Sequence, residues 1–409
     1  MLVGLATADN GAASLEELAR LVESAGASVV GEVVQRRARP DAATFVGSGK
    51  VETVHARVKE TGADLVVFDE ELSAAQQRNL ERQLSTKVLD RTALVLDIFA
   101  QRAHTREGRL QVELAQLTYL LPRLTGRGVV LSRLGGGIGT RGPGETKLEV
   151  DRRRIRARIT ALQRAIAGLR RQRGLQRRAR EEAALPVVAL IGYTNAGKSS
   201  LLNSLTNAQI MTADRLFATL DPTVRRAVLP NHRPVLLVDT VGFIEKLPHD
   251  LVAAFRATLE EVVEADLLVH VVDGSHPRWA EQMTAVEGVL QDLGAVDAPR
   301  IIAINKIDRI SPETLRDIEA EVPGAVPISA LRQIGLLNLL RKISQRLPDP
   351  ATRVNLEIPY REGGVLSQIY RQGRVLRRDD RADAMIVEAE VPASALPRLR
   401  PYVKDRPSL

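Results

Sequence analysis

One stretch, Gly192–Ser199, constrains this chain more than any other. It reads G-Y-T-N-A-G-K-S and fits the phosphate-loop pattern G-x-x-x-x-G-K-[ST]. The apolar run Leu185–Ile191 before it is typical of a strand buried on both faces, and Ser200–Leu205 after it carries leucines at helical spacing. Strand, glycine loop and helix are the context that the motif requires, whereas a chance glycine turn is the alternative for an isolated match. The stretch therefore predicts an α/β domain with a parallel sheet and a phosphate-binding loop.

The chemistry of such a loop follows from its backbone. Glycines let successive N–H groups converge on a β-phosphate at the positive end of a new helix. Lys198 adds a cation between the β- and γ-phosphates, and the Ser199 hydroxyl is a predicted Mg²⁺ ligand. The predicted nucleotide-binding residues of the loop are Gly192, Tyr193, Thr194, Asn195, Ala196, Gly197, Lys198 and Ser199.

Two downstream segments match the elements of phosphate-loop enzymes that contact Mg²⁺ and the γ-phosphate. Thr219 is predicted to ligate Mg²⁺ and to sense the γ-phosphate. In the D-x-x-G element after the strand-like Val235–Val238, Asp239 is expected to reach Mg²⁺ through water and the Gly242 N–H to hold the γ-phosphate. Lys198, Thr219 and Gly242 are thus the predicted catalytic residues. The nucleotide-binding residues predicted in these segments are Phe217, Ala218, Thr219, Leu220, Asp221, Asp239, Thr240, Val241 and Gly242.

An N-K-x-D element that follows the strand-like Ile301–Ile304 predicts which nucleotide base the site binds. The Asp308 carboxylate would accept from the guanine ring N–H and amine, a donor pair that adenine does not present. The guanine-binding residues predicted here and in the later S-A-L element are Asn305, Lys306, Ile307, Asp308, Ser329, Ala330 and Leu331. Four motifs in this order predict an enzyme that hydrolyses GTP to GDP and phosphate, with Mg²⁺ as cofactor.

The residue after Gly242 is Phe243, whereas many small GTPases place there a glutamine that orients the attacking water. Glu245 or a backbone carbonyl could substitute. We expect slow intrinsic hydrolysis that a partner accelerates. Asn195 is a candidate K⁺ ligand that would bring a positive charge beside the phosphates.

Residues 1–104 alternate strand-like and helix-like segments and predict a small parallel α/β domain. The predicted strands are Leu2–Ala6, Ser28–Val34, Asp64–Phe68 and Lys87–Leu89, and the predicted helices start with a capping box at Ser14–Glu17, near residue 50 and at Ser73. The G-S-G-K run Gly47–Lys50 is either a turn before a helix, which we favour, or a second phosphate loop.

Residues 105–184 predict an antiparallel helical hairpin, because two sets of apolar residues recur at spacings of three and four. Pro122 is expected to end or kink the first helix. The first set is Leu110, Leu114, Leu117, Leu121 and Leu124, and the second is Ile155, Ile159, Leu162, Ile166 and Leu169.

Between the two sets lies the Gly-rich tip loop 126–144, which contains eight glycines. It is either a plain linker or a tip that orders against RNA through its backbone and through Arg127, Arg133 and Arg141.

The second helix carries the basic charge of the chain. Arg152–Arg180 holds twelve arginines and no acidic residue, in a chain of net charge +8. The alternatives are a solvated helix face and a polyanion-binding face, of which we favour the second; charge alone does not separate RNA from DNA.

The remaining divisions are a GTPase domain at 185–347 and, after Pro348-Asp349-Pro350, a small C-terminal α/β domain at 350–409. The chain has no cysteine, and we find neither a signal-peptide pattern nor an apolar run long enough to span a membrane. We expect a cytoplasmic monomer without stable membrane insertion, with peripheral membrane association left open.

The motifs together resemble the HflX family, and the most specific match is the G-G-G-I-G-T-R-G-P-G-E-T-K-L-E run with D-R-R-R-I, at Gly135–Ile155. The resemblance covers the first three predicted domains. It implies a cytosolic GTPase that binds the large ribosomal subunit and its RNA, splits stalled or idle ribosomes, and brings the hairpin tip near the peptidyl-transferase region. The alternatives are a GTPase of ribosome assembly or RNA modification, and a regulatory GTPase that acts on a protein or membrane surface.

Overall fold

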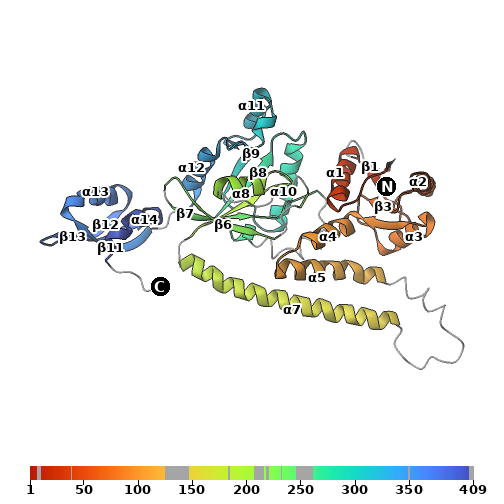
Figure 1. Cartoon of the computed structure of the whole chain (residues 1–409), viewed down its shortest axis with the longest axis horizontal. Helices are drawn as coiled ribbons and strands as arrows, with labels where there is room; N and C mark the ends of the chain where they lie inside the picture. The colour runs from red at the N-terminus through yellow and green to blue at the C-terminus, as the bar shows by residue number, and fades with distance from the viewer. Residues whose placement is uncertain are drawn as a thin grey trace.

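The described chain is organised around three β-sheets and one pair of long helices (Figure 1). A four-stranded sheet comes first, followed by the helix pair, a six-stranded sheet and a three-stranded sheet. The predicted α/β fold class is confirmed. The computed structural model describes residues 1–6, 11–37, 39–124, 147–182, 185–206, 216–217, 221–231, 233–245, 261–348 and 351–404.

The four-stranded sheet runs in the order β2-β1-β3-β4, and every neighbouring pair is parallel. A helix follows each strand, as parallel pairing requires a crossover connection. The second strand begins at Glu32 rather than at the predicted Ser28. The elements are β1 (Leu2–Ala6), α1 (Gly11–Ser24), β2 (Glu32–Arg36), α2 (Ser48–Thr61), β3 (Leu65–Phe68), α3 (Ala74–Leu84), β4 (Lys87–Asp90) and α4 (Arg91–Arg102).

The capping box predicted at Ser14–Glu17 is wrong, because α1 begins at Gly11 and Ser14 lies inside the helix. The Ser14 hydroxyl instead donates to Asp69 Oδ2 at 2.5 Å. A complete capping box is found at α3, where Ser73 is the N-cap and exchanges hydrogen bonds with Gln76. Gly47 is the N-cap of α2, in agreement with the interpretation of a turn before a helix.

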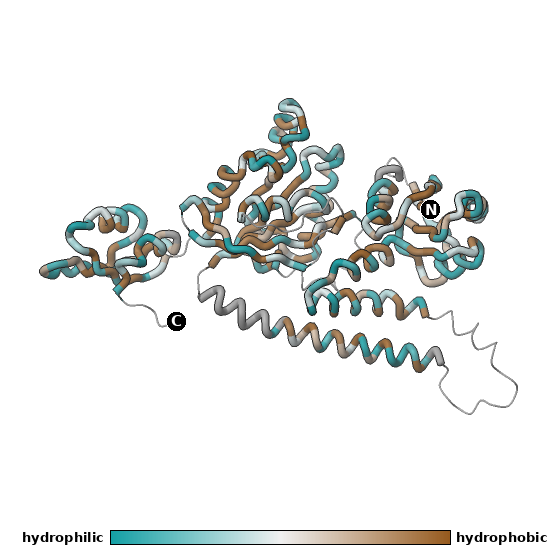
Figure 2. The backbone as a smooth tube through the Cα atoms, viewed as in Figure 1, coloured by the Kyte–Doolittle hydropathy of each residue, from teal (hydrophilic) through white to brown (hydrophobic). Residues whose placement is uncertain are grey.

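The helix pair consists of α5 (Arg106–Arg123) and α7 (Lys147–Glu182), which lie side by side and antiparallel (Figure 1). Figure 2 shows hydrophobic and hydrophilic residues alternating along α5 and along the coloured part of α7. Leu162 and Ile166 of the predicted α7 seam are buried, and Arg158 Nε donates to Glu113 Oε1 of α5 at 2.7 Å. Helix α5 ends one residue after Pro122, as predicted. The Gly-rich tip loop 126–144 lies outside the described residues.

The six-stranded sheet runs in the order β10-β9-β8-β5-β7-β6 and is parallel except for the edge strand β6. Its strands are β5 (Val187–Ile191), β6 (Thr223–Val228), β7 (Pro234–Asp239), β8 (Leu267–Asp273), β9 (Arg300–Asn305) and β10 (Val326–Pro327). Its described helices of eight or more residues are α8 (Lys198–Thr206), α10 (Trp279–Asp292), α11 (Pro312–Glu321) and α12 (Leu336–Arg346).

The C-terminal sheet is antiparallel in the order β11-β13-β12. Apolar side chains of β11 and β13 pack with Leu366 and Ile369 of α13 in a core of their own. The elements are β11 (Ala351–Pro359), α13 (Gly363–Gln372), β12 (Arg374–Asp380), β13 (Ala384–Pro392) and the short α14 (Leu396–Leu399).

The N-terminal sheet and the six-stranded sheet each have a hydrophobic core of their own, and the two units also share a third hydrophobic cluster. The shared cluster includes Leu94 and Phe99 of α4 together with Tyr193, Phe217 and Phe243 of the nucleotide-binding segments. Apolar burial of this kind stabilises the contact between the two units. The N-terminal unit is therefore packed against the elements that carry the predicted nucleotide site.

Candidate nucleotide site

The phosphate loop connects β5 to α8 and adopts a conformation that requires its glycines. Gly192 and Gly197 have φ values of 147° and 95°, which L side chains rarely adopt. A Cβ atom at Gly192 would lie 2.2 Å from the Val271 carbonyl oxygen, and one at Gly197 would lie 2.3 Å from Asn305 Nδ2. The motif glycines thus let the loop backbone pass close to β8 and β9.

Lys198, at the start of α8, is buried beneath the loop. Its Nζ donates to the carbonyl oxygens of Gly192 at 3.0 Å and Tyr193 at 2.9 Å. Burial lowers the pKa of Lys198 to about 8, against the opposing influence of the Asp239 carboxylate. A phosphate group at this loop would supply the anionic partner that favours the charged ammonium.

Two oxygen donors lie together next to the loop. The Ser199 hydroxyl donates to Asp239 Oδ2 at 2.6 Å, and Asp239 is fully buried at the end of β7. Hydroxyl and carboxylate oxygens are the ligands that Mg²⁺ prefers, and Mg²⁺ completes its shell with substrate phosphates and water. The pair therefore fits a magnesium ion, which would neutralise phosphate charge. Within the described ranges no group of three or more His, Cys, Asp or Glu side chains is arranged to hold a metal.

The D-x-x-G segment lies directly on the phosphate loop. The Thr194 N–H donates to the Phe243 carbonyl at 2.7 Å, and the Phe243 N–H donates to the Gly192 carbonyl at 3.2 Å. A Cβ atom at Gly242 would lie 2.8 Å from Thr194 Cα and 3.1 Å from Lys198 Nζ. A side chain at this position would push the two segments apart.

Of the described residues after this segment, neither Phe243 nor Glu245 has a side chain free to orient the attacking water. Phe243 is buried in the hydrophobic cluster that the two units share. The carboxylate of Glu245, one proposed substitute for the absent glutamine, pairs with Arg278 at 2.6 Å. Asn195 is exposed in the loop in a left-handed conformation, with φ 61°. Its amide oxygen is of the type that binds K⁺.

The predicted guanine-binding residues come together at the ends of β9 and β10. Asn305 joins two loops, because its Nδ2 donates to the Ala196 carbonyl at 2.8 Å and its Oδ1 accepts from the Ala330 N–H at 3.0 Å. Asp308 is exposed and accepts from the Ser329 hydroxyl at 2.5 Å. This hydrogen bond lowers the pKa of Asp308, so the carboxylate is ionised and able to accept from a base. Leu331 is 71% exposed.

Lys306, between these residues, adopts a left-handed conformation and pairs with Asp273 of β8 at 2.6 Å. Three further predicted residues, Ala218, Thr219 and Leu220, lie outside the described part of the chain.

Comparisons with known proteins identify the family of this chain. Family models match residues 12–100 (GTP-binding GTPase N-terminal), 102–180 (GTP-binding GTPase Middle Region) and 187–306 (50S ribosome-binding GTPase). A GTPase HflX of Caldanaerobacter subterraneus is 48% identical over 403 residues, which cover 98% of this chain and 93% of the relative. The chain belongs to the HflX family of GTPases.

A second HflX GTPase, from Escherichia coli, is 46% identical over 368 residues, which cover 89% of this chain and 86% of the relative. Among solved structures, a GDP complex of a GTP-binding protein from Sulfolobus solfataricus aligns with 84% of this chain and 98% of its own, at 25% identity and a TM-score of 0.43. The family and the phosphate-loop domain establish that this HflX GTPase is a GTP hydrolase.

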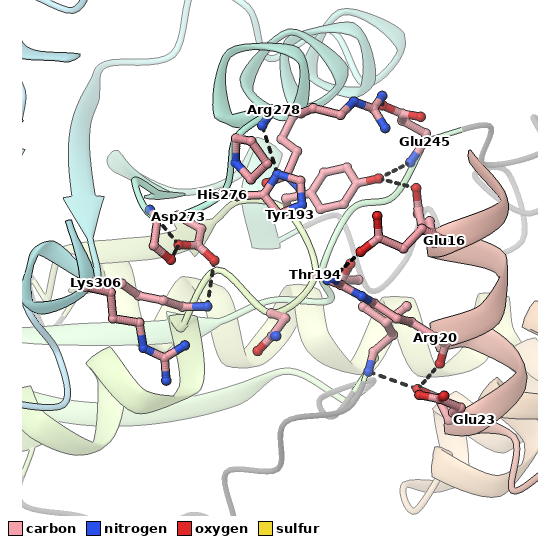
Figure 3. A pocket seen from close by; sticks show the side chains of 18 residues that line it. Glu16, Arg20, Glu23, Tyr193, Thr194, Glu245, Asp273, His276, Arg278 and Lys306 are labelled. Atoms are coloured by element: carbon pink, nitrogen blue, oxygen red, sulfur yellow. Dashed lines mark hydrogen bonds and ion pairs between the residues drawn. The ribbon is translucent and has the colours of Figure 1, made fainter. Parts of the chain in front are cut away.

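The N-terminal unit forms a second wall of the site, which the sequence motifs did not predict. A cavity of about 740 Å³ lies between α1 and the nucleotide loops, and Arg20, Thr194, Asn195 and Lys306 are among the residues that line it (Figure 3). Helix α1 therefore faces the phosphate loop across this cavity.

Polar contacts across this wall converge on Tyr193. Its hydroxyl accepts from the Glu245 N–H at 2.9 Å (Figure 3) and donates to Glu17 Oε2 at 2.8 Å. Burial raises the pKa of Glu17, and Arg91, at 2.9 Å from Glu17 Oε1, only partly offsets this. Arg91 is itself buried and also pairs with Asp69 at 2.8 Å. This network holds the phosphate loop and the Glu245 segment to the N-terminal sheet.

The sequence did not predict the contacts of Glu17, Asp69 and Arg91, because these residues lie outside the nucleotide-binding motifs. One usable signal was Arg91, an arginine between an apolar strand and an apolar helix, since a buried charge requires partners. No helix in the described part of this HflX chain has the length and apolarity needed to cross a membrane.

Proposed function

We propose that this HflX GTPase binds the large ribosomal subunit through its helical hairpin and couples GTP binding and hydrolysis to ribosome splitting or rescue. The family model that covers residues 187–306 carries the description 50S ribosome-binding GTPase. The structural observation that supports the proposal most directly is the exposed arginine face of α7.

The arginine face is defined by Arg153, Arg164 and Arg171, all of which are exposed. They are separated by 11 and 7 residues, close to three and two helical turns, so they lie along one line. That line is opposite the α7 seam that packs on α5, at Leu162 and Ile166. At about 1.5 Å per residue the line is about 27 Å long. A linear row of guanidinium groups of this length fits a phosphate backbone better than it fits a compact acidic patch.

The nucleotide cycle would act through the site described above. We propose that Ser199 holds Mg²⁺ directly, that Asp239 holds it through water, and that Thr219 joins them when a γ-phosphate is present. Lys198 and the Gly242 N–H would hold the γ-phosphate, and Asn195 would hold K⁺ beside the phosphates. Loss of the γ-phosphate removes these contacts and releases the segments that carry Thr219 and Gly242.

Binding to isolated ribosomal subunits at several salt concentrations tests the proposal. The triple variant R153A/R164A/R171A should bind the large subunit more weakly, and its salt slope should fall by about 2 to 3 because three phosphate contacts are lost. The matched control R353A/R361A/R374A removes three exposed arginines of the C-terminal unit. Equal binding of both triple variants and the unaltered chain, or binding to acidic liposomes without binding to RNA, would contradict the proposal.

A further inference from the structure

Asp221 is the last residue of the predicted nucleotide-binding segment Phe217–Asp221. Its carboxylate, however, contacts the residues that begin the first helix of the hairpin. Oδ2 accepts from the backbone N–H groups of His104 and Thr105, each at 2.8 Å, and Oδ1 accepts from the Thr105 hydroxyl. Thr105 is the N-cap of α5. One carboxylate of the GTPase domain therefore receives three hydrogen bonds from the residues that begin the hairpin.

The first turn of α5 is shaped around this carboxylate. Gly108 donates its N–H to Thr105 Oγ1 at 3.0 Å. A Cβ atom at Gly108 would lie 2.3 Å from Asp221 Oδ1 and 3.1 Å from Thr105 Oγ1. Glycine is an unfavourable helix residue, so its presence in this turn is explained by the space that Asp221 occupies.

The other end of the segment is held by the N-terminal unit. Phe217 is buried and packs edge-to-face on Phe99 of α4, with ring centroids 4.7 Å apart. The neighbouring Leu216 N–H donates to the Ser24 hydroxyl of α1 at 3.1 Å. Phe217 adopts φ 56°, which is uncommon for a non-glycine residue and indicates that these contacts determine its conformation.

We infer that Asp221 and Phe217 are positioning residues that couple the nucleotide state to the hairpin. Thr219, the predicted γ-phosphate sensor, is two residues from each anchor. Four residues span at most about 14 Å, so Thr219 is tied to both anchors by a short length of chain. A change of contact at the nucleotide therefore acts on the first turn of α5 as well. By thermodynamic reciprocity, a partner that fixes that turn changes the relative affinity for GTP and GDP.

Amide hydrogen exchange of the full chain tests this coupling, with GDP and with a non-hydrolysable GTP analogue. The amides of His104, Thr105 and Gly108 should exchange at rates that differ about fivefold or more between the two states. D221A should abolish the difference. The matched control S73A removes the cap of α3, in the same N-terminal unit, and should keep the nucleotide dependence at α5.

A second variant separates coupling from a purely structural role. G108A places a better helix former in α5 and forces Asp221 away. A structural role alone predicts slower exchange at α5 and an unchanged nucleotide dependence, whereas coupling predicts that the dependence is lost as in D221A. Equal exchange in both nucleotide states in the unaltered chain, or a nucleotide dependence that survives in both D221A and G108A, would overturn the inference. The experiment contains no ribosome, so its outcome does not depend on the proposed ribosomal partner.

Discussion

The two walls of the nucleotide site are built in different ways. The phosphate-loop wall consists of short contiguous motifs, each at the end of a strand of the six-stranded sheet. The N-terminal wall consists of single residues, such as Glu17 and Arg91, that contact Tyr193 and Glu245 across 176 and 154 positions of sequence. Binding chemistry therefore requires backbone groups at fixed spacing, whereas coupling between units requires only that a few side chains meet.

The largest expected effect is on the N-terminal wall. R91M keeps most of the side-chain volume but leaves the Glu17 and Asp69 carboxylates buried without their cation. It should lower the free energy of unfolding by about 3–5 kcal/mol in chemical denaturation. R353M, which breaks an exposed ion pair with Glu388, should cost at most about 1 kcal/mol. Similar losses in both variants would show that the Arg91 network does not stabilise the wall.

The phosphate-loop wall could be predicted from the sequence to a greater extent than the N-terminal wall. The strand–loop–helix around Gly192, the order of the motifs and the buried α7 residues Leu162 and Ile166 were predictable, because local spacing determines each. Glu17 was assigned to a capping box, since that pattern has the same spacing as a pair of residues on one helix face. The contact of Asp221 with Thr105 was not predictable, because no local pattern records which distant donors a carboxylate meets.

On the phosphate-loop wall, K198A should lower the rate of GTP hydrolysis by about 10²–10³-fold, as expected for loss of one charge that stabilises the transition state. Single-turnover hydrolysis, with the protein in excess and concentrated enough to bind all the GTP, measures this. The circular dichroism spectrum should be unchanged, because Lys198 bonds only to loop carbonyls among the contacts described. A rate within tenfold of the unaltered chain would remove Lys198 from the catalytic residues.

Base selection should depend on Asp308. D308N replaces an acceptor with a group that also donates, so GTP should bind about 10–100-fold more weakly while xanthosine triphosphate, which carries a carbonyl in place of the amine, should bind more tightly. Competition with a fluorescent nucleotide gives both affinities. D297N, at an exposed aspartate outside the motifs, should leave both unchanged.

A pH dependence follows from the pKa of about 8 at Lys198. The unfolded lysine keeps its proton to about pH 10.4, so between pH 8 and 10 the unfolded state binds more protons and stability rises with pH. Without nucleotide, the free energy of unfolding of the chain relative to K198M should rise by about 1.4 kcal/mol per pH unit in this window. A flat difference would mean that Lys198 has its ordinary pKa.

The smallest effect is expected at Tyr193, the residue that belongs to both walls. Y193F removes the hydrogen bonds to Glu17 and Glu245 and should cost about 1 kcal/mol of stability and change the affinity for GTP. Y402F removes a tyrosine–carboxylate hydrogen bond with Glu362 in the C-terminal unit. It should leave GTP affinity unchanged. An unchanged affinity in Y193F would restrict the N-terminal wall to a structural role.

GTP hydrolysis by the purified chain, alone and with isolated large or small ribosomal subunits, tests the proposed ribosomal role directly. We expect slow hydrolysis by the protein alone, stimulation by the large subunit but not by the small one, and loss of that stimulation in R153A/R164A/R171A. Fast hydrolysis without any subunit, or no stimulation by the large subunit, would contradict it.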